Sequence, residues 1–349
     1  MNIFIYIFIS FVISATLIPC IIVLCKRNSW YDSTNERKIH SGLVPRLGSI
    51  GFVSAFIITT ILYYILNKNI RFFDIFPIAL AGFIIFIFGI IDDFKDLPAK
   101  FKLLIQIISS LIMVLSGYRF TQIGNIQLGW FGYVLSFVWF IGVINAFNLI
   151  DGIDALCGGL SFFITITLGI IFTVANSPSP ATLSFILAAA ILGFLLYNKP
   201  KAKIFMGDGG SQFLGFMIAA FSLYPTNESI EYNKFLMAAL LSAIPIFDTL
   251  AAIWRRTREH RSFFSPDKAH LHHKLMNLHY STLGILFFLY ALQLGLCGIV
   301  ILALWCEGLK GCILLCGGFT AMILFFAVIH YTNRAIINKY KNKIENDSN

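Results

Sequence analysis

The sequence predicts an all-α integral membrane protein with about eleven transmembrane helices. Of its 349 residues, 58% are hydrophobic and only 12% are charged, and this composition excludes a water-soluble enzyme. Nine stretches contain no Lys, Arg, Asp or Glu, and their residues are apolar on every face, whereas the strands of a membrane barrel alternate polar and apolar residues. Each stretch can supply the roughly 20 apolar residues of one helical span; they are 1–25, 48–67, 75–91, 103–118, 120–150, 155–198, 209–227, 275–306 and 311–333.

The spans follow in chain order from these stretches. The first stretch is hydrophobic like a signal peptide, but no small-residue cleavage site follows it and Lys26 and Arg27 end it, so we interpret it as a retained span. The segments 176–180 and 305–311 carry the Pro, Gly or polar residues that separate neighbouring helices. We therefore expect spans at 3–25, 48–66, 74–91, 102–118, 130–148, 158–176, 181–197, 211–224, 234–252, 281–304 and 312–332.

The basic residues predict how these spans are oriented. Of the 26 Lys and Arg residues, 21 lie in connections on one side of the expected membrane: 26–47, 92–102, 198–210, 253–280 and 333–349. Because the basic side faces the cytoplasm, we expect the N-terminus outside and the C-terminus inside. The net charge of +9 then reflects membrane topology and predicts no nucleic-acid partner.

This topology gives one transmembrane catalytic domain, 1–333, followed by a polar, frayed cytoplasmic tail, 334–349. The expected active-site loops all face the cytoplasm, and they are 26–47, 92–102, 145–159, 198–211 and 253–280.

Carboxylates mark two of these loops. Asp92 and Asp93 follow an apolar span directly, with Pro98 and Lys102 a few residues later. Such a pair fits either a solvated helix end or a site with a divalent cation and a general base. In the next loop Asn145, Asn148, Asp151 and Asp154 are spaced by three, which places them on one helical stripe as far as Gly152 allows. Carboxylates beside a bilayer with no neighbouring cation in the sequence favour a functional role.

The loop at 198–211 places one carboxylate, Asp208, among glycines directly before an apolar helix. Backbone N–H groups at such a helix start can bind phosphate while the Asp holds a metal ion. A Gly-rich turn of this kind is common, so the motif alone is weak evidence.

The last loop, 253–280, contains six Lys and Arg residues and five histidines. The dense positive charge disfavours zinc at His270 and His273 and favours an anion site for phosphates. Asp248, inside the preceding span, has two readings: a functional carboxylate or the ion-pair partner of Arg255 or Arg256.

Taken in order, these motifs resemble the polyprenyl-phosphate N-acetylhexosamine-1-phosphate transferases, glycosyltransferase family 4. The resemblance rests on Asp92-Asp93 with Lys102, on Asn148-x-x-Asp151-Gly-x-Asp154, on Phe205-Met-Gly-Asp208 and on His270-x-His272-His273; the loop 32–48 fits as well. Ala155 stands where the family usually has Gly. The histidine motif is similar to that of the branch that transfers GlcNAc-1-phosphate to begin O-antigen, common-antigen or teichoic-acid units.

The resemblance implies transfer of GlcNAc-1-phosphate from UDP-GlcNAc to undecaprenyl phosphate, which gives undecaprenyl-pyrophosphoryl-GlcNAc and UMP. It implies Mg²⁺ or Mn²⁺ as cofactor and an inner-membrane location with the active site on the cytoplasmic side, and it allows a homodimer. The candidate catalytic residues are Asp92, Asp93, Asp151, His270, His272 and His273; the candidate metal ligands are Asp208 and Asp151; the candidate substrate-binding residues are Lys102, Asn148, Asp154, Asn198, Phe205, Arg255 and Arg256. Whether Asp92 or Asp93 is the base or a metal ligand stays open.

Three other functions share features with this sequence. The first is transfer of phospho-N-acetylmuramoyl-pentapeptide or of another UDP-HexNAc, a different branch of the same chemistry. The second is a membrane transporter, whose ionisable residues would lie near the middle of the bilayer. The third is a CDP-alcohol phosphotransferase, whose motif requires an Arg after Ala155; position 156 is Leu, which excludes it.

Overall fold

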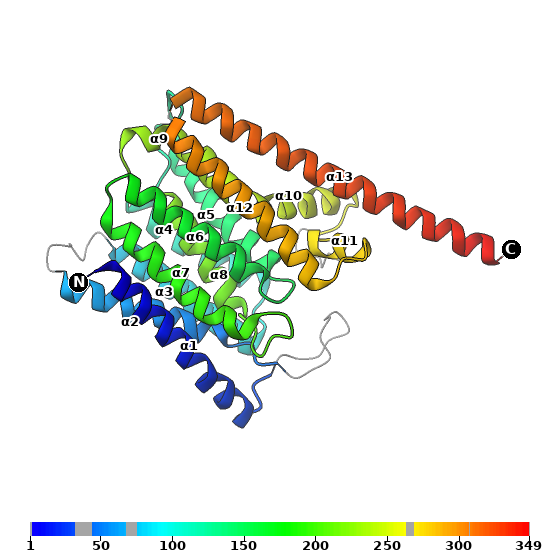
Figure 1. Ribbon diagram of the computed structural model, residues 1–349, viewed down its shortest axis with the longest axis horizontal. Helices are drawn as coiled ribbons and strands as arrows, with labels where there is room; N and C mark the ends of the chain where they lie inside the picture. Colours follow the sequence, from blue (N-terminus) through cyan, green and yellow to red (C-terminus); the bar gives the residue numbers. More distant parts are fainter. Residues whose placement is uncertain (1, 32–43, 68–74, 263–268, 307, 349) are drawn as a thin grey trace.

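The computed structural model describes residues 2–31, 44–67, 75–262, 269–306 and 308–348, and these residues form helices joined by short connections with one small hairpin (Figure 1). The parts of the first and last expected cytoplasmic loops at 32–43 and 263–268 lie outside the described residues. The elements are α1 (Ile3–Arg27), α2 (Gly48–Leu66), α3 (Phe76–Lys95), α4 (Ala99–Leu115), β1 (Gln122–Ile123), β2 (Ile126–Gln127), α5 (Phe131–Ile150), α6 (Leu156–Val174), α7 (Pro178–Asn198), α8 (Asp208–Ser222), α9 (Glu228–Leu241), α10 (Ala243–Arg258), α11 (Leu271–Asn277), α12 (Thr282–Cys306) and α13 (Gly308–Ser348).

The protein is an all-α, multi-pass membrane protein, and each expected span falls on one helix except 234–252, which is divided between α9 and α10. Among the described residues, eight helices are long and apolar enough to cross a bilayer, and α9 with α10 forms a ninth candidate bent by 66°. The other two expected spans are α4 and α8, whose 17 and 15 residues make them shorter than a full span.

The short helix α8 forms the centre of the bundle. At 1.5 Å per residue it rises about 22 Å, less than the roughly 30 Å hydrocarbon core. All of its residues from Gly209 to Ser222 are buried, and it packs against α3 and α5. Because neighbouring helices enclose α8, it need not cross the whole hydrocarbon core, and its first residue, Asp208, lies within the bundle with its side chain 22% exposed.

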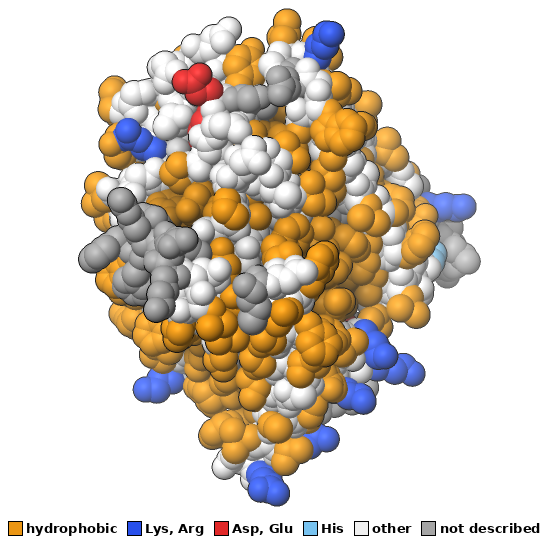
Figure 2. All heavy atoms as spheres, turned by 60° about the vertical axis from the view of Figure 1, so that its left-hand side comes forward, with side chains coloured by type: hydrophobic (Ala, Val, Ile, Leu, Met, Phe, Trp, Pro, Cys, Tyr) orange, Lys and Arg blue, Asp and Glu red, His pale blue; other side chains and the backbone are white. Residues whose placement is uncertain are grey.

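The outer surface fits a lipid environment. Figure 2 shows a broad hydrophobic area on one face, with Lys and Arg toward its margins. Large apolar side chains of α1, α2 and α3 are exposed, for example Phe8 at 66%, Ile65 at 65% and Phe83 at 55%. A patch of this extent is unfavourable in water and normal against lipid tails.

Small polar residues hold the first helix in place. The hydroxyls of Ser10 and Ser14, one turn apart on α1, donate to the carbonyl oxygens of Ile186 and Ala190 in α7 at 2.8 and 2.7 Å. Such interhelical hydrogen bonds and close contacts replace the hydrophobic driving force that is absent between helices in lipid.

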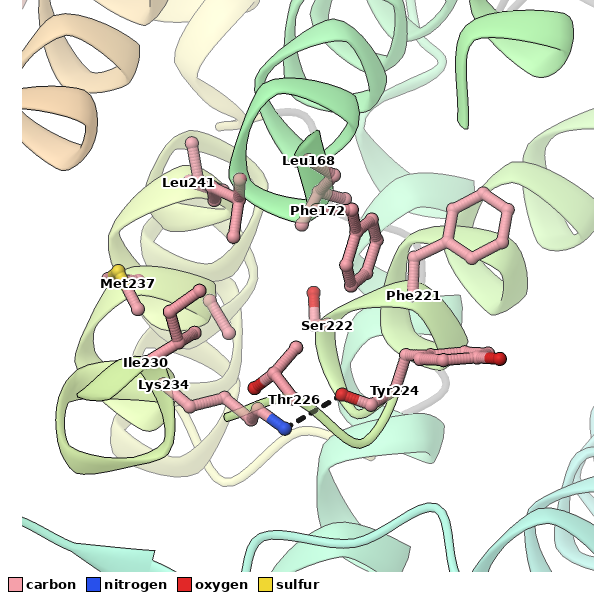
Figure 3. A pocket seen from close by; sticks show the side chains of 12 residues that line it. Leu168, Phe172, Phe221, Ser222, Tyr224, Thr226, Ile230, Lys234, Met237 and Leu241 are labelled. Atoms are coloured by element: carbon pink, nitrogen blue, oxygen red, sulfur yellow. Dashed lines mark hydrogen bonds between the residues drawn. The ribbon is translucent and has the colours of Figure 1, made fainter. Parts of the chain in front are cut away.

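The two ends of the bundle differ in character. At the end remote from Asp208, buried Lys234 donates to the carbonyl oxygen of Tyr224 at 2.7 Å (Figure 3). Lys234 also pairs with Glu231, which in turn accepts from the Thr226 hydroxyl. These bonds tie the α8–α9 connection to α9 beside a small, mainly apolar cavity. They close the bundle at this end, and the candidate site residues all lie at the other.

Two segments differ from expectation. The tail 334–349 was expected to be frayed, but α13 continues as a helix to Ser348 and projects from the bundle (Figure 1). The loop 253–280 contains an unexpected helix, α11, which carries His272 and His273. Neither segment contains the long apolar run from which the helical spans were predicted, so neither helix was expected.

Candidate active site

The first part of the site forms where the end of α3 meets the start of α8. Gly89 of α3 lies against Gly209 of α8 so closely that a side chain at position 89 would overlap the backbone of α8. The missing side chain lets the two helices approach, and this brings Asp92 and Asp93 beside Asp208. Residues 106 to 116 positions apart in the sequence are thereby joined in one cluster.

Asp93 organises the beginning of α8. Its Oδ1 accepts the N–H of Asp208 at 2.7 Å, its Oδ2 accepts the N–H of Gly209 at 3.1 Å, and its side chain is 0% exposed. A carboxylate that satisfies these otherwise unpaired N–H groups also interacts favourably with the helix dipole. The expectation that these amides bind phosphate directly is therefore wrong for this arrangement, because Asp93 already occupies them.

Asp208 lies at the centre of a chain of ion pairs. Lys102 Nζ is 2.8 Å from Asp208 Oδ2 and also contacts Asp92, and Arg46 Nη2 is 3.7 Å from both Asp208 Oδ1 and Asp93 Oδ1. Burial by itself raises the pKa of Asp208, but the hydrogen bond from Lys102 and the positive charges of Lys102 and Arg46 outweigh it and hold the pKa below its usual value. Asp208 is therefore an anion that remains 22% exposed and accessible to a ligand.

Asp92 differs from Asp93 in its contacts. Its Oδ1 accepts the N–H of Leu97 at 2.7 Å, which fixes the turn before α4, while its Oδ2 faces Lys102. One oxygen of Asp92 is thus part of the charged cluster, whereas both oxygens of Asp93 are bound to backbone. This contrast separates two residues that the sequence left equivalent.

The second part of the site comes from the α5–α6 connection. Asn148 Nδ2 donates to Ser211 Oγ of α8 at 3.0 Å. Asp151 follows the end of α5, and burial, then the charge of Asp208, raises its pKa to about 7, so the two carboxylates lie within electrostatic reach. The expected stripe is interrupted, since α5 ends at Ile150 and Asp154 lies beyond a turn.

Asp154 and Asn198 support the turn that follows. Asp154 Oδ2 accepts the N–H of Ala202 at 3.0 Å. Asn198 accepts the N–H of Ala155 at 2.9 Å and donates to the carbonyl of Ile204 at 2.8 Å. The backbone N–H of Phe205 donates to the carbonyl of Pro45 at 2.7 Å, and this bond brings the segment beside Arg46. The polar groups of Asn198 are thus engaged in joining two loops.

Ala155 has an unusual backbone conformation. Its φ of 63° is left-handed, a conformation that costs an L-residue roughly 1–2 kcal/mol and favours glycine. Its carbonyl accepts the Tyr290 hydroxyl at 2.5 Å, and its N–H is bound by Asn198. Hydrogen bonds on both sides hold the strained residue, at a position where glycine would adopt the same conformation without strain.

We expect Ala155→Gly to stabilise the protein by about 1 kcal/mol, because it relieves the left-handed strain and keeps both backbone hydrogen bonds. The check is the thermal midpoint of the purified protein in detergent. Ala175→Gly is the matched control, since Ala175 has a right-handed conformation and should lose stability. A lower midpoint for Ala155→Gly would contradict the strain.

The third part of the site is the histidine segment. Asp248 Oδ2 lies 2.9 Å from His270 Nδ1, and its Oδ1 accepts the N–H of Leu271 at the start of α11 at 2.7 Å. The interpretation of Asp248 as the partner of Arg255 or Arg256 is therefore wrong; it binds the histidine segment. This carboxylate, 1% exposed, joins α10 to α11.

His272 connects this segment to the α5–α6 connection. Its imidazole lies against the backbone of Gly152, and a side chain at position 152 would overlap it. Burial, then the charge of His273, lowers the pKa of His272 to about 3, so the ring is neutral at physiological pH. Its ring centroid is 4.1 Å from that of His273. His272 is thus a neutral ring and not a cation for phosphate.

The arginines of the last loop lie at the end of α10. Arg256 is buried, and Arg255 is within electrostatic reach of His330 in α13. Arg46 was not predicted as a site residue, but it contacts Asp93 and Asp208. Its signal in the sequence was its place in the motif Pro45-Arg46-Leu-Gly48. Asp248 had the clearer signal, a lone carboxylate within an apolar span.

A bundle of membrane helices that gathers aspartates, a lysine, an arginine and histidines at one end defines a class of protein, the membrane-embedded enzymes that act on charged substrates. The family model for glycosyl transferase family 4 matches residues 75–226. The chain is 33% identical over 278 residues to a probable undecaprenyl-phosphate N-acetylglucosaminyl 1-phosphate transferase of Bacillus subtilis (strain 168), covering 77% of this chain and 76% of that protein.

Relatives in other bacteria give the same result. The undecaprenyl-phosphate alpha-N-acetylglucosaminyl 1-phosphate transferase of Escherichia coli (strain K12) is 34% identical over 266 residues, 72% of this chain and 71% of that protein. The Yersinia pestis protein of the same name is 34% identical over 260 residues, 70% and 69% of the two chains. This chain belongs to glycosyl transferase family 4, as the motifs predicted.

Proposed function

We propose that the protein transfers GlcNAc-1-phosphate from UDP-GlcNAc to undecaprenyl phosphate, producing undecaprenyl-pyrophosphoryl-GlcNAc and UMP. The observation that carries the proposal is the position of Asp208, ionised and partly exposed between Lys102 and Arg46 at one end of a bilayer-spanning bundle. The names of the family relatives specify the substrates. We further propose that this end faces the cytoplasm in the inner membrane, because 21 of the 26 Lys and Arg residues belong to the connections on its side.

The two substrates explain the location of the site. A nucleotide sugar is soluble and arrives from the aqueous phase, whereas a polyprenyl phosphate keeps its chain in the bilayer and presents only its head group at the surface. A charged cluster at the end of the helices meets both. The product would then begin a cell-envelope polysaccharide.

In this mechanism an oxygen of the lipid phosphate attacks the phosphorus that bears the sugar, and the bond from that phosphorus to UMP breaks. The reaction requires in-line positioning and neutralisation of charge. Lys102 and Arg46 bind phosphate oxygens and offset the charge that develops on UMP. Asp92, through the oxygen that faces Lys102, takes up a proton when the lipid phosphate arrives protonated.

Asp151, Asp154, Asn148 and Phe205 are assigned to donor binding. We assign the other side of the site, facing the aspartates, to His270, His272 and His273. There the neutral ring of His272 donates or accepts a hydrogen bond, and Asp248 orients His270. Asn198 acts on the donor pocket by fixing the Ala155 turn.

The carboxylates also fit Mg²⁺. Among the described residues no three His, Cys, Asp or Glu side chains form a complete metal site. Mg²⁺ commonly uses one or two carboxylates together with substrate phosphates and water, so a caged site is not required. Asp208, with Asp151 within electrostatic reach, would hold the ion, and Mg²⁺ when bound would neutralise the donor pyrophosphate.

The test uses reversibility. One phosphoanhydride replaces another, so the equilibrium lies near unity and added UMP should drive the reaction backwards. With Mg²⁺ and undecaprenyl phosphate present, the enzyme should exchange labelled UMP into UDP-GlcNAc. A transferase that moves only the sugar releases UDP and exchanges no UMP, and a hydrolase releases sugar phosphate without requiring lipid.

A donor panel resolves the family branch. Membranes containing the protein should convert UDP-GlcNAc and leave UDP-MurNAc-pentapeptide unchanged. Absence of UMP exchange in a preparation that makes lipid-linked sugar would refute phosphoryl transfer; conversion of the pentapeptide donor alone would refute the GlcNAc assignment.

A further inference from the structure

The break between α9 and α10 has a chemical cause at one carbonyl. In a continuous helix the carbonyl of Leu241 would accept the N–H of residue 245, but position 245 is Pro, which has no N–H and whose ring collides with the carbonyl four residues earlier. The two helices meet here at 66°. A buried backbone carbonyl without a partner is costly, especially within a bilayer.

Gln293 of α12 supplies the missing donor. Its Nε2 donates to the carbonyl of Leu241 at 3.0 Å and lies 3.5 Å from Cys297 Sγ. The opposite amide orientation would place two oxygens against each other, so the donor must face Leu241. Gln293 is 0% exposed and is the only amide or charged side chain of α12. A buried amide is costly in a span, and the NH₂ group of Gln293 has a specific partner, whereas its Oε1 has no hydrogen-bond partner among the described residues.

The direction of α10 determines where the histidine segment lies. Asp248 is on the second turn after the break and holds His270 and the start of α11. His272, two residues after His270 in the chain, lies against Gly152, the neighbour of Asp151. A change in the angle between α9 and α10 would therefore move the histidines relative to the aspartates.

The same face of α12 holds the other side of the site. Tyr290 is three residues before Gln293, which places the two side chains on one face of the helix. Tyr290 binds the carbonyl of Ala155 at 2.5 Å, in the turn that follows Asp151. One rigid helix thus contacts both the α5–α6 connection and the break that directs the histidine segment.

We propose that Gln293 is a positioning residue, which fixes the angle of α10 and so aligns His270 and His272 with the aspartates. This inference rests on the proposed function, because it concerns the turnover of that reaction. Gln293 does not touch substrate, and its effect passes through Leu241, α10 and Asp248.

The test first removes the hydrogen bond from Gln293 to the carbonyl of Leu241 and then gives that carbonyl another donor. Gln293→Met keeps the length and apolar contacts of the side chain but has no donor. Pro245→Ala restores a backbone N–H that can bind the carbonyl of Leu241. We measure kcat for lipid-linked sugar per bound UDP-GlcNAc, so that unfolded protein does not contribute, in the four combinations of the two variants.

In the wild-type background we expect Gln293→Met to lower kcat about tenfold, equivalent to about 1.4 kcal/mol. The donor KM should change by less than about twofold, and with Pro245→Ala the loss should shrink to below about threefold, because neighbouring effects coupled through one group are not additive. Ser184→Ala is the control: Ser184 is buried in α7 and donates to a carbonyl of its own helix, so its kcat should not change.

The proposal would be overturned if Gln293→Met lowered kcat by the same factor with and without Pro245→Ala. It would also be overturned if Gln293→Met kept the full wild-type kcat per bound donor. A second double-mutant experiment combines Gln293→Met with Asp248→Asn. The turnover that remains in Asp248→Asn should hardly change when Gln293→Met is added, and an additive loss of kcat would also overturn the proposal. Absence of lipid-linked sugar with the wild-type enzyme would instead refute the proposed function, so the two failures are distinguishable.

Discussion

Asp208→Asn should abolish turnover while the protein remains folded. The substitution is nearly isosteric but removes the charge between Lys102 and Arg46, and we expect kcat to fall by about 10³-fold or more, roughly 4 kcal/mol of transition-state stabilisation. The fold should persist because Lys102 keeps its contact with Asp92, Arg46 keeps Asp93, and both side chains remain partly exposed to water.

The measurement is lipid-linked sugar formed by purified protein across a range of Mg²⁺ concentrations, together with the thermal midpoint. Excess Mg²⁺ should not restore full turnover. Asp96→Asn is the matched control, since Asp96 is an exposed carboxylate beyond the end of α3 with a φ of 45°, a conformation that Asn tolerates. Near-normal activity in Asp208→Asn would refute the assignment of Asp208 as metal ligand and centre of the site.

Asp92→Asn and Asp93→Asn should fail in different ways, although the residues are adjacent. In Asp92→Asn the amide oxygen can still accept from Leu97, so stability should be preserved while the loss of charge lowers kcat about 100-fold or more. In Asp93→Asn the new NH₂ group faces the N–H of Asp208 or of Gly209, and one donor is left unsatisfied. This costs about 1–3 kcal/mol of stability and displaces Asp208, so activity and the thermal midpoint should both fall.

The comparison of the two variants is more informative than either one. Thermal midpoints and kcat per bound donor are measured side by side, again with Asp96→Asn as reference. Equal midpoints for Asp92→Asn and Asp93→Asn would contradict the assignment of Asp93 to the start of α8. Retained turnover in Asp92→Asn would remove Asp92 from the reaction.

The sequence predicted more of the fold than of the site. Eight of the eleven expected spans coincide with helices long enough to cross a bilayer, because a run of about 20 apolar residues has few alternatives to a helix in lipid. The other three fall on the short helices α4 and α8 and on the bent pair α9 and α10. The family was also predictable, since Asp92, Asp151, Asp208 and His270 stand in ordered motifs. Helix α11 and the helical tail were not predicted, because both segments are polar and neither contains the long apolar run from which the spans were predicted.

Contacts between distant residues explain the remaining differences. Nothing local separates Asp92 from Asp93; the separation arises because α8 presents its N–H groups to one of them. The role of Asp248 depends on His270, 22 residues away, and that of Gln293 on Leu241, 52 residues away. Ala155 looked like a minor departure from a motif until its left-handed backbone showed what the position requires.

Composition and short-range periodicity are properties of the chain alone, and they were enough to predict the class of protein, most of the helices and the set of charged residues. The packing of distant segments was needed to learn which partner each carboxylate binds and which residue holds each loop, because hydrogen bonds and ion pairs depend on distances below about 4 Å. Such distances are set by how α3, α8, α10 and α12 pack together, and no local pattern in the chain specifies them.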